Sequence, residues 1–306
     1  MSITAFPQVR EFLKTHTNHA SHLPKIAVFD CDGTIIKGDI GEAMLYYQLE
    51  HFHFKVSPAE VWPDHPRRGE LDRWFGVLAG ADAAGRSSRP EFAPFADLIL
   101  SWYFDQLAEG RIEKACADIV RLFAGHTLDE VRKIAEETFL DETRSPVSER
   151  MLGTRGRPKG ARYIRECTEL LALLLRRGFV VWAVSGSNKW SVEPVFRRLG
   201  IPAEQVIGID LIERDGILTA TPLEPIPIHA KKVDALREHV PGAPLLVASD
   251  SRLDIPLLQY SSGLRIYVNS HQRNPSDFFT IGKIVRDDSW VVIEHPTLER
   301  IETPSV

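Results

Sequence analysis

Residues 25–36 read KIAVFDCDGTII. An apolar run rich in β-branched residues ends in two aspartates, Asp30 and Asp32, with only Cys31 between them. The run is typical of a strand buried on both faces. Because side chains alternate along a strand, Asp30 and Asp32 are expected on one side and Cys31 on the other, where it packs. Two neighbouring carboxylates repel each other, so this ending needs a physical reason.

Composition limits the classes of protein to which the chain can belong. It has 306 residues, a formal net charge of −5 and a pI of about 6.1, which argues against a dedicated nucleic-acid binder. Three widely spaced cysteines favour a reducing compartment over a disulfide framework. The N-terminus lacks the apolar core of a signal peptide, and the most apolar segment, residues 170–175, is too short to span a bilayer. We therefore expect a cytoplasmic protein without membrane partners.

Strand and helix patterns alternate in the second half of the chain. Residues 164–177 suit an amphipathic helix that ends at Gly178, and the apolar run 179–184 suits a buried strand. The same alternation continues with helices 189–199, 230–239 and 252–260 and strands 206–211, 244–249, 264–269 and 290–294. The dipeptide Asp215-Gly216 predicts a hairpin after strand 206–211. Together with strand 25–30, this predicts an α/β fold with a doubly wound parallel, Rossmann-like sheet.

Residues 40–150 lack comparable strands and look helical. Helices are expected over 41–52, 70–80, 96–110, 114–125 and 128–140, with a loop at 79–94. The stretch 144–160, rich in Arg, Pro and Gly, suits a linker. We therefore expect a helical domain, residues 39–158, inserted into an α/β domain formed by residues 1–38 and 159–306.

Polar and charged groups follow three of the predicted strands where each strand ends. In open α/β sheets, ligands bind beyond the carboxyl ends of the strands. The groups expected at this edge are Asp30, Asp32, the turn Ser185-Gly186-Ser187, Asp250, Asp254 and one of the lysines Lys231 and Lys232. A hard cation such as Mg²⁺ tolerates clustered carboxylates and is often shared with a substrate phosphate. One carboxylate could then attack phosphorus while a second moves a proton, and Ser185, turn N–H groups and a lysine hold phosphate oxygens.

These motifs together resemble the haloacid dehalogenase superfamily, whose members include aspartate-nucleophile phosphohydrolases. DCDGT (30–34) is similar to its first motif, Ser185 to its second, Lys232 in KVDAL to its third, with Lys231 as the alternative, and SDSRLD (249–254) to its fourth. All four occur in the family's order. True dehalogenases of the family lack the second aspartate, so Asp32 favours phosphate chemistry.

The resemblance implies a role for each matching residue. Asp30 would be the nucleophile and a Mg²⁺ ligand, and Asp32 the general acid and base, binding Mg²⁺ through its carbonyl. Asp250 would be a metal ligand, and Asp254 would orient Lys232 or a metal-bound water. The phosphate would be bound by Gly33, Thr34, Ser185, Gly186 and Lys232.

The inserted domain resembles the family's helical cap. Its position, the SGS turn (185–187) and the hairpin at 219–225 most resemble the family's phosphoserine phosphatase branch. An acidic residue after the first motif contacts the substrate amine there, and Asp39 has that spacing, although the branch uses Glu. A phosphocholine-acting branch also fits, because aromatic faces hold quaternary ammonium groups. The aromatic candidates in the cap are Tyr46, Tyr47, Trp62, Trp74, Trp102 and Tyr103.

Several of these residues could instead have a purely structural role. Asp39 and Glu42 could merely favour a helix N-terminus, and the cap aromatics could be core. DCDGT fails as a calcium loop, since Ile35 and Gly41 occupy positions that need Gly and an acid. His51 and His53 have the wrong spacing for a metal pair on one helix face and are expected to be structural.

The sequence thus predicts a Mg²⁺-dependent phosphatase that hydrolyses a small phosphorylated metabolite, phosphoserine-like or phosphocholine-like, through an aspartyl-phosphate on Asp30. Two alternatives stay open. One is a phosphotransferase or phosphomutase on the same scaffold, and the other is a non-catalytic module that binds a phosphorylated ligand.

Overall fold

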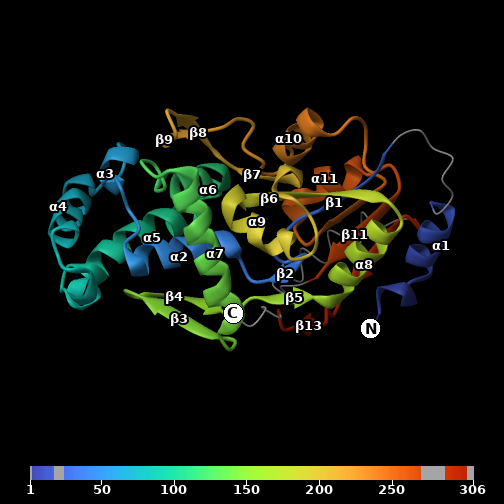
Figure 1. Ribbon diagram of the computed structural model, residues 1–306, viewed down its shortest axis with the longest axis horizontal. Coiled ribbons are helices and arrows are strands. Elements are labelled where there is room, and N and C mark those ends of the chain that lie inside the picture. The colour runs from blue at the N-terminus through green and yellow to red at the C-terminus, as the bar shows by residue number, and fades with distance from the viewer. Residues whose placement is uncertain (1, 17–23, 270–286, 302–306) are drawn as a thin grey trace. The chain divides into compact units, whose positions relative to one another are not determined.

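A computed structural model describes residues 2–16, 24–269 and 287–301 (Figure 1). Contacts divide the chain into two units. The first contains residues 1–40, 161–208 and 227–306, and the second contains residues 41–160 and 209–226. Each unit is described by itself below. That they act as catalytic domain and cap, with the boundaries 39 and 158, stays a prediction.

The first unit is built on a parallel sheet. Within the described ranges, six strands form it in the order β12-β11-β10-β1-β6-β7, and the pairs from β12 to β6 are parallel. The strands are β1 (Lys25–Phe29), β6 (Phe179–Asn188), β7 (Val206–Ile209), β10 (Leu246–Ser249), β11 (Leu264–Val268) and β12 (Trp290–Ile293). The predicted α/β class with a parallel sheet is confirmed, and the opening stretch forms its centre.

Helices of the first unit supply the apolar partners of this sheet. They are α1 (Pro7–Thr15), α8 (Arg165–Arg176), α9 (Lys189–Arg197), α10 (Lys231–His239) and α11 (Ile255–Tyr260), with short 3-10 turns η1 (Ile3–Ala5), η3 (Ala203–Gln205) and η4 (Arg252–Asp254). On one face Val28 belongs to a buried cluster with Leu236 of α10 and Leu257 of α11. On the other face the ring of Phe179 lies 5.9 Å from that of Phe12 in α1. Alternation along the strands thus buries both faces.

A small antiparallel sheet in the first unit holds the ends of the inserted segment together. It consists of β2 (Ile36–Lys37), β5 (Arg162–Ile164) and β13 (Leu298–Glu299). Lys37 pairs with Arg162, so the chain leaves and re-enters this unit at adjacent residues. The pairing also anchors the turn that follows β1.

The second unit is mainly helical. Its helices are α2 (Ile40–His51), α3 (Pro58–Val61), α4 (Arg68–Ala79), α5 (Phe92–Ala108), α6 (Ile112–Arg121) and α7 (Leu128–Arg144), with the 3-10 turn η2 (Ala83–Ser88). Capping signals in the sequence explain where some of them begin. Thr127 accepts from the N–H of Glu130 and Glu130 from that of Thr127, a capping box that starts α7.

The hairpin predicted at Asp215-Gly216 is present, as β8 (Leu211–Arg214) and β9 (Ile217–Pro222). Both turn residues have positive φ, 52° and 78°, as a two-residue hairpin turn requires. The hairpin belongs to the second unit, where Leu218 exchanges main-chain hydrogen bonds of 2.8 Å with Gly125 and His126.

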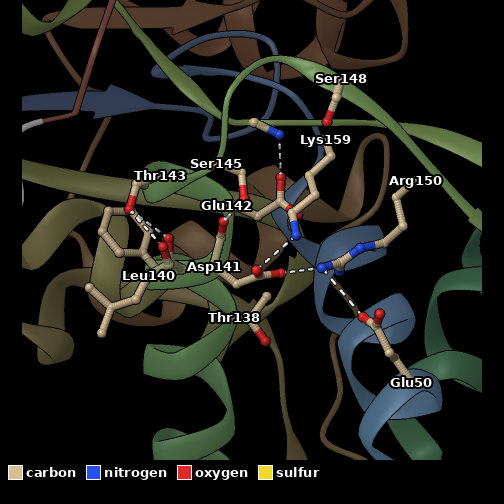
Figure 2. Close-up of polar contacts among 12 residues, drawn as sticks. Glu50, Thr138, Leu140, Asp141, Glu142, Thr143, Ser145, Ser148, Arg150 and Lys159 are labelled. Carbon is tan, nitrogen blue, oxygen red and sulfur yellow. Dashed lines mark hydrogen bonds and ion pairs between the residues drawn. The ribbon is translucent and has the colours of Figure 1, made fainter.

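The predicted linker at 144–160 is wrong. Most of it forms a second hairpin, β3 (Ser148–Leu152) and β4 (Arg155–Lys159), with a turn at Gly153 and Thr154. Its basic side chains face the acidic end of α7: Arg150 and Lys159 pair with Asp141, and Arg157 pairs with Glu142. Figure 2 shows the Asp141 pairs and the acceptors on α7. This hairpin could not be predicted from the local sequence, because the acidic side chains that stabilise it lie on another element, α7.

Candidate active site

The turn after β1 is shaped by main-chain hydrogen bonds. The N–H groups of Thr34, Ile35 and Ile36 converge on the carbonyl oxygen of Cys31 at 2.8–3.2 Å. Gly33 donates to the carbonyl of Ile36 with a φ of +73°, a conformation that glycine adopts without steric cost. The Cys31 side chain is fully buried. The turn therefore fixes the backbone that carries Asp30 and Asp32.

Asp30 is buried and fully engaged. Its Oδ1 accepts from the N–H of Cys31 at 2.8 Å and from Nζ of Lys232 at 3.0 Å. Its Oδ2 lies 3.4 Å from Oγ of Ser249, the last residue of β10. Neighbouring strands β1 and β10 thus bring the predicted nucleophile beside the fourth motif, as the strand-end argument expected.

Lys232 is the lysine that pairs with Asp30. It lies on α10, is only 5% exposed, and its Nζ lies 2.6 Å from Oδ2 of Asp254. Ser249 donates to that same oxygen at 2.7 Å. Asp254 therefore contacts Lys232 directly, and its role in orienting that lysine stays a prediction. Lys232 as the phosphate ligand remains a prediction.

Asp32 is held at both carboxyl oxygens. Oδ1 accepts from the N–H of Ile40 at 2.7 Å, and Oδ2 accepts from Oγ of Ser187 at 2.7 Å. The hydroxyl of Ser185 is more distant, at 3.5 Å from Oδ2. The sequence places Ser187 in the turn at this edge but assigns it no role; the two-residue period of strand β6 puts it on the same side as Ser185.

The surroundings favour the neutral form of the two aspartic acids, Asp30 and Asp32, but the charged form of Lys232. Burial, with Asp254, Asp250 and Asp32 nearby, raises the pKa of Asp30 well above its usual range despite Lys232. Burial also raises the pKa of Asp32 to about 8, with Asp39 and Asp250 adding to the rise and Ile40 and Ser187 opposing it.

The pKa of Lys232 is shifted in the direction that keeps its side chain charged. Burial alone would lower the pKa of Lys232, but Asp254 and Asp30 overcome it and raise the pKa. The site thus holds one buried cation among a surplus of carboxyl groups. An acid such as Asp32, which keeps its proton near neutral pH, is suited to donating that proton.

The other predicted site residues belong to the same unit. Asp39 and Asp250 both act on the charge of Asp32, so they lie within electrostatic range of it. Thr34 is fully buried, and its hydroxyl has no hydrogen-bond partner in the part of the chain described. A side chain on Gly186 would meet Cδ1 of Ile228 at 2.7 Å, so the turn after Ser185 packs closely on that residue. Phosphate binding by these groups stays a prediction.

The aromatic residues of the second unit are engaged within it. Trp62 donates to the carbonyl of Asp118, and Trp102 donates to its carboxylate, both at 2.9 Å. Nζ of Lys114 already lies over the Trp102 ring, 5.1 Å from its centre. Tyr103 donates to Glu42 at 3.2 Å. These contacts show that Trp62 and Trp102 pack within the second unit. Packing is the structural alternative to their forming an ammonium cage.

The donors at this site suit a hard divalent cation. Among the residues described, no three His, Cys, Asp or Glu side chains form a metal-binding group. The predicted set needs only two carboxylates, Asp30 and Asp250, and the main-chain oxygen of Asp32, because Mg²⁺ usually takes its remaining ligands from water and phosphate. A cation would also offset the surplus negative charge that raises the pKa of Asp30 and Asp32. The residues therefore fit Mg²⁺.

In the described ranges, no helix is both long and apolar enough to cross a bilayer.

The sequence profile of haloacid dehalogenase-like hydrolases matches residues 27–259. That range begins in β1 and ends in α11, so it contains all four strand-end motifs. No curated protein matches the chain in sequence.

Solved structures share the fold at low sequence identity. A conserved protein of unknown function from Anaerococcus prevotii is 19% identical, with a TM-score of 0.76 over 92% of this chain and 89% of that one. A protein of unknown function from Bordetella pertussis is 18% identical, with a TM-score of 0.52 over 89% and 98%. A phosphoserine phosphatase is 15% identical over 90% and 95%, but its TM-score of 0.44 is too low to support an inference. The first two likenesses establish the fold alone.

Proposed function

The chain belongs to the haloacid dehalogenase-like hydrolase family and is an enzyme of that type, and from this premise we propose that it is a Mg²⁺-dependent phosphatase. The substrate is a small phosphomonoester, hydrolysed through an aspartyl-phosphate on Asp30. The observation that carries the proposal is the buried array of Asp30, Lys232 and Asp254, with Asp32 as a second, independently held acid.

Asp30 is the nucleophile in this proposal. An oxygen of its carboxylate attacks phosphorus, and the bond from phosphorus to the leaving oxygen breaks with its electron pair on that oxygen. Lys232, held by Asp254, supplies positive charge toward the phosphoryl oxygens. Ser185 and the N–H groups of its turn bind the same group, as does the hydroxyl of Thr34, whereas the N–H of Gly33 already donates to the carbonyl of Ile36.

Asp32 moves the proton. It protonates the leaving oxygen and becomes a carboxylate, and it then takes a proton from the water that attacks the aspartyl-phosphate. Hydrolysis returns Asp30 to a carboxylate and releases inorganic phosphate. The raised pKa of Asp32, about 8, supports its role as the acid of the first step.

Asp30, the main-chain carbonyl of Asp32 and Asp250 would hold Mg²⁺. When bound, the ion would neutralise negative charge between the carboxylates and the phosphate. For the leaving group, we propose an alcohol that carries an ammonium group, as in phosphoserine or phosphocholine. Asp39 supports this proposal, because it adds a negative charge near Asp32.

The test is hydrolysis of p-nitrophenyl phosphate by the wild type and by Asp30→Asn, with Mg²⁺ and with a chelator. We expect the loss of the nucleophile to lower kcat by at least about 10⁴-fold, and the chelator to abolish turnover. Asp234→Asn is the matched control, because Asp234 is an exposed aspartate paired only loosely, at 3.5 Å, with Arg237.

Two results would reject the mechanism: activity that persists in Asp30→Asn, or activity that persists without metal. Tight binding of phosphorylated ligands without turnover would favour the non-catalytic module instead. With a turning-over enzyme, comparing phosphoserine with phosphocholine then selects the substrate class.

A further inference from the structure

Ser187 joins two groups of the site that the sequence motifs treat separately. Its Oγ lies 2.7 Å from Oδ2 of Asp32, and its N–H donates to Oγ of Ser185 at 3.1 Å. Ser185 and Ser187 lie two residues apart in β6, so they share one side of the strand. One residue therefore contacts both the proton-transferring acid and the hydroxyl proposed to bind phosphate.

The two oxygens of Asp32 have partners of different kinds. Oδ1 accepts from the main-chain N–H of Ile40, which can only donate. Oδ2 faces the hydroxyl of Ser187, which can donate to a carboxylate or rotate to accept from a carboxylic acid. Oδ1 therefore stays an acceptor in either state, and the transferable proton belongs on Oδ2.

The backbone of Ser187 is fixed on both sides. Gly186 packs so closely on Ile228 that a Cβ at this position would lie 2.7 Å from its Cδ1. Asn188 caps the following helix α9 by accepting from the N–H of Ser191 at 2.8 Å. A hydroxyl carried by so constrained a backbone can hold its partner in one orientation.

We propose that Ser187 is a positioning residue that holds Oδ2 of Asp32 toward the leaving oxygen during proton transfer, an inference that rests on the proposed phosphatase function. As the bond from phosphorus to the leaving oxygen breaks, the proton on Oδ2 passes to that oxygen. The electron pair of the O–H bond stays on Asp32, and Ser187 then donates to the new carboxylate.

The experiment compares two aryl phosphates that differ in how much they need a proton. The kcat/KM for phenyl phosphate and for p-nitrophenyl phosphate is measured with Mg²⁺ for the wild type, Ser187→Ala and Ser187→Thr. Phenolate is the poorer leaving group, so its departure depends more on acid catalysis. Ser191→Ala is the control, since Ser191 is buried and its Oγ donates only to the carbonyl of Asn188.

Ser187→Ala is expected to lower kcat/KM for phenyl phosphate about tenfold and for p-nitrophenyl phosphate less than about twofold. Ser187→Thr keeps the hydroxyl and should restore the wild-type ratio of the two values, and Ser191→Ala should leave that ratio unchanged.

An equal fall for both esters, or no fall for either, overturns the positioning role while leaving the phosphatase intact. If Ser187→Ala is unstable, the ratio measured in Ser187→Thr decides, because a positioning hydroxyl predicts the wild-type value. A wild type that hydrolyses neither ester overturns both this inference and the proposed function, so the two failures are distinguishable.

Discussion

Two regions of the molecule bury carboxyl groups, and their charge surroundings are opposite. At the end of β1 and β10, Asp30 and Asp254 share one buried lysine, Lys232, and Asp32 lies nearby without a cationic partner among the described residues. At the end of α7, two acids are matched by three basic side chains of the hairpin β3–β4. The first region leaves negative charge uncompensated, whereas the second balances it.

The α7 region shows what a stabilising arrangement looks like. Burial alone would raise the pKa of Asp141, but Lys159 and Arg150 overcome it and hold that pKa below its usual range. Arg150 also lies 3.4 Å from Glu50, and Glu142 accepts from the N–H of Gly160 at 2.9 Å. In Figure 2 these side chains converge from α2, α7 and the hairpin. The acids there have partners supplied by the fold.

The two kinds of acidic cluster differ in the direction in which they shift the pKa of their acids. A structural cluster lowers the pKa of its acids, because its cations are in place. A reactive one raises the pKa of acids such as Asp30 and Asp32, because burial and neighbouring carboxylates outweigh the groups that stabilise their charged forms. Three experiments test this distinction.

Asp32→Asn should have the largest effect, and on activity rather than stability. Loss of the proton donor is expected to lower kcat/KM by about 10²–10⁴-fold. In the folded protein at about pH 5 an amide replaces a neutral acid, so the free energy of unfolding should not fall by more than about 1 kcal/mol. Urea unfolding and phenyl phosphate hydrolysis measure the two quantities.

The comparison would fail at this point if Asp32→Asn lost several kcal/mol of stability at the same pH. That result would make Asp32 an ionised structural partner, like the acids of α7.

Glu142→Gln should have its effect on stability rather than on activity. It leaves the buried guanidinium of Arg157 without its counter-charge, which is expected to cost about 3 kcal/mol of unfolding free energy. Glu70→Gln is the matched control, because its pair with Arg67 is exposed and screened by solvent, so its loss should have little effect on stability. Equal losses in urea unfolding for both variants would mean that burial adds nothing to the α7 pair.

Much of the first region could be predicted from the sequence because its signals are local. An apolar run that ends in DCDGT fixes the strand, the turn and the two acids within a few residues. The resemblance of KVDAL to the family's third motif favoured Lys232 over Lys231, and Lys232 is the lysine that pairs with Asp30. The rule that ligands bind beyond the carboxyl ends of the strands placed these groups at one edge of the sheet.

The hairpin at 148–159 could not be predicted in this way. Its charges have partners on α7, which is a separate element, and its Gly, Pro and Arg content alone suits a linker. The contact of Ser187 was missed for a different reason. The sequence places Ser187 at the same edge, but only its distance to Asp32 in the folded chain reveals that the two side chains meet.

The smallest expected effect is on the pH dependence of stability, measured without metal. Between pH about 4 and about 8, the folded protein keeps a proton on Asp32 that the unfolded chain has released. The free energy of unfolding therefore falls as the pH rises, by at most about 1.4 kcal/mol per pH unit from this group. Asp32→Asn removes that contribution, so its stability relative to the wild type should increase with pH.

Asp141→Asn provides the opposite sign in the same measurement. Because the pKa of Asp141 is lowered, its contribution is present above the unfolded value of 3.8 and is lost as the pH falls through the folded value. The variant should therefore be less stable than the wild type at neutral pH, and this deficit should shrink in acid. If urea unfolding with a chelator gave parallel pH profiles for Asp32→Asn and the wild type, Asp32 would not hold the proton. The two acidic regions would then not differ in the way that makes one of them reactive.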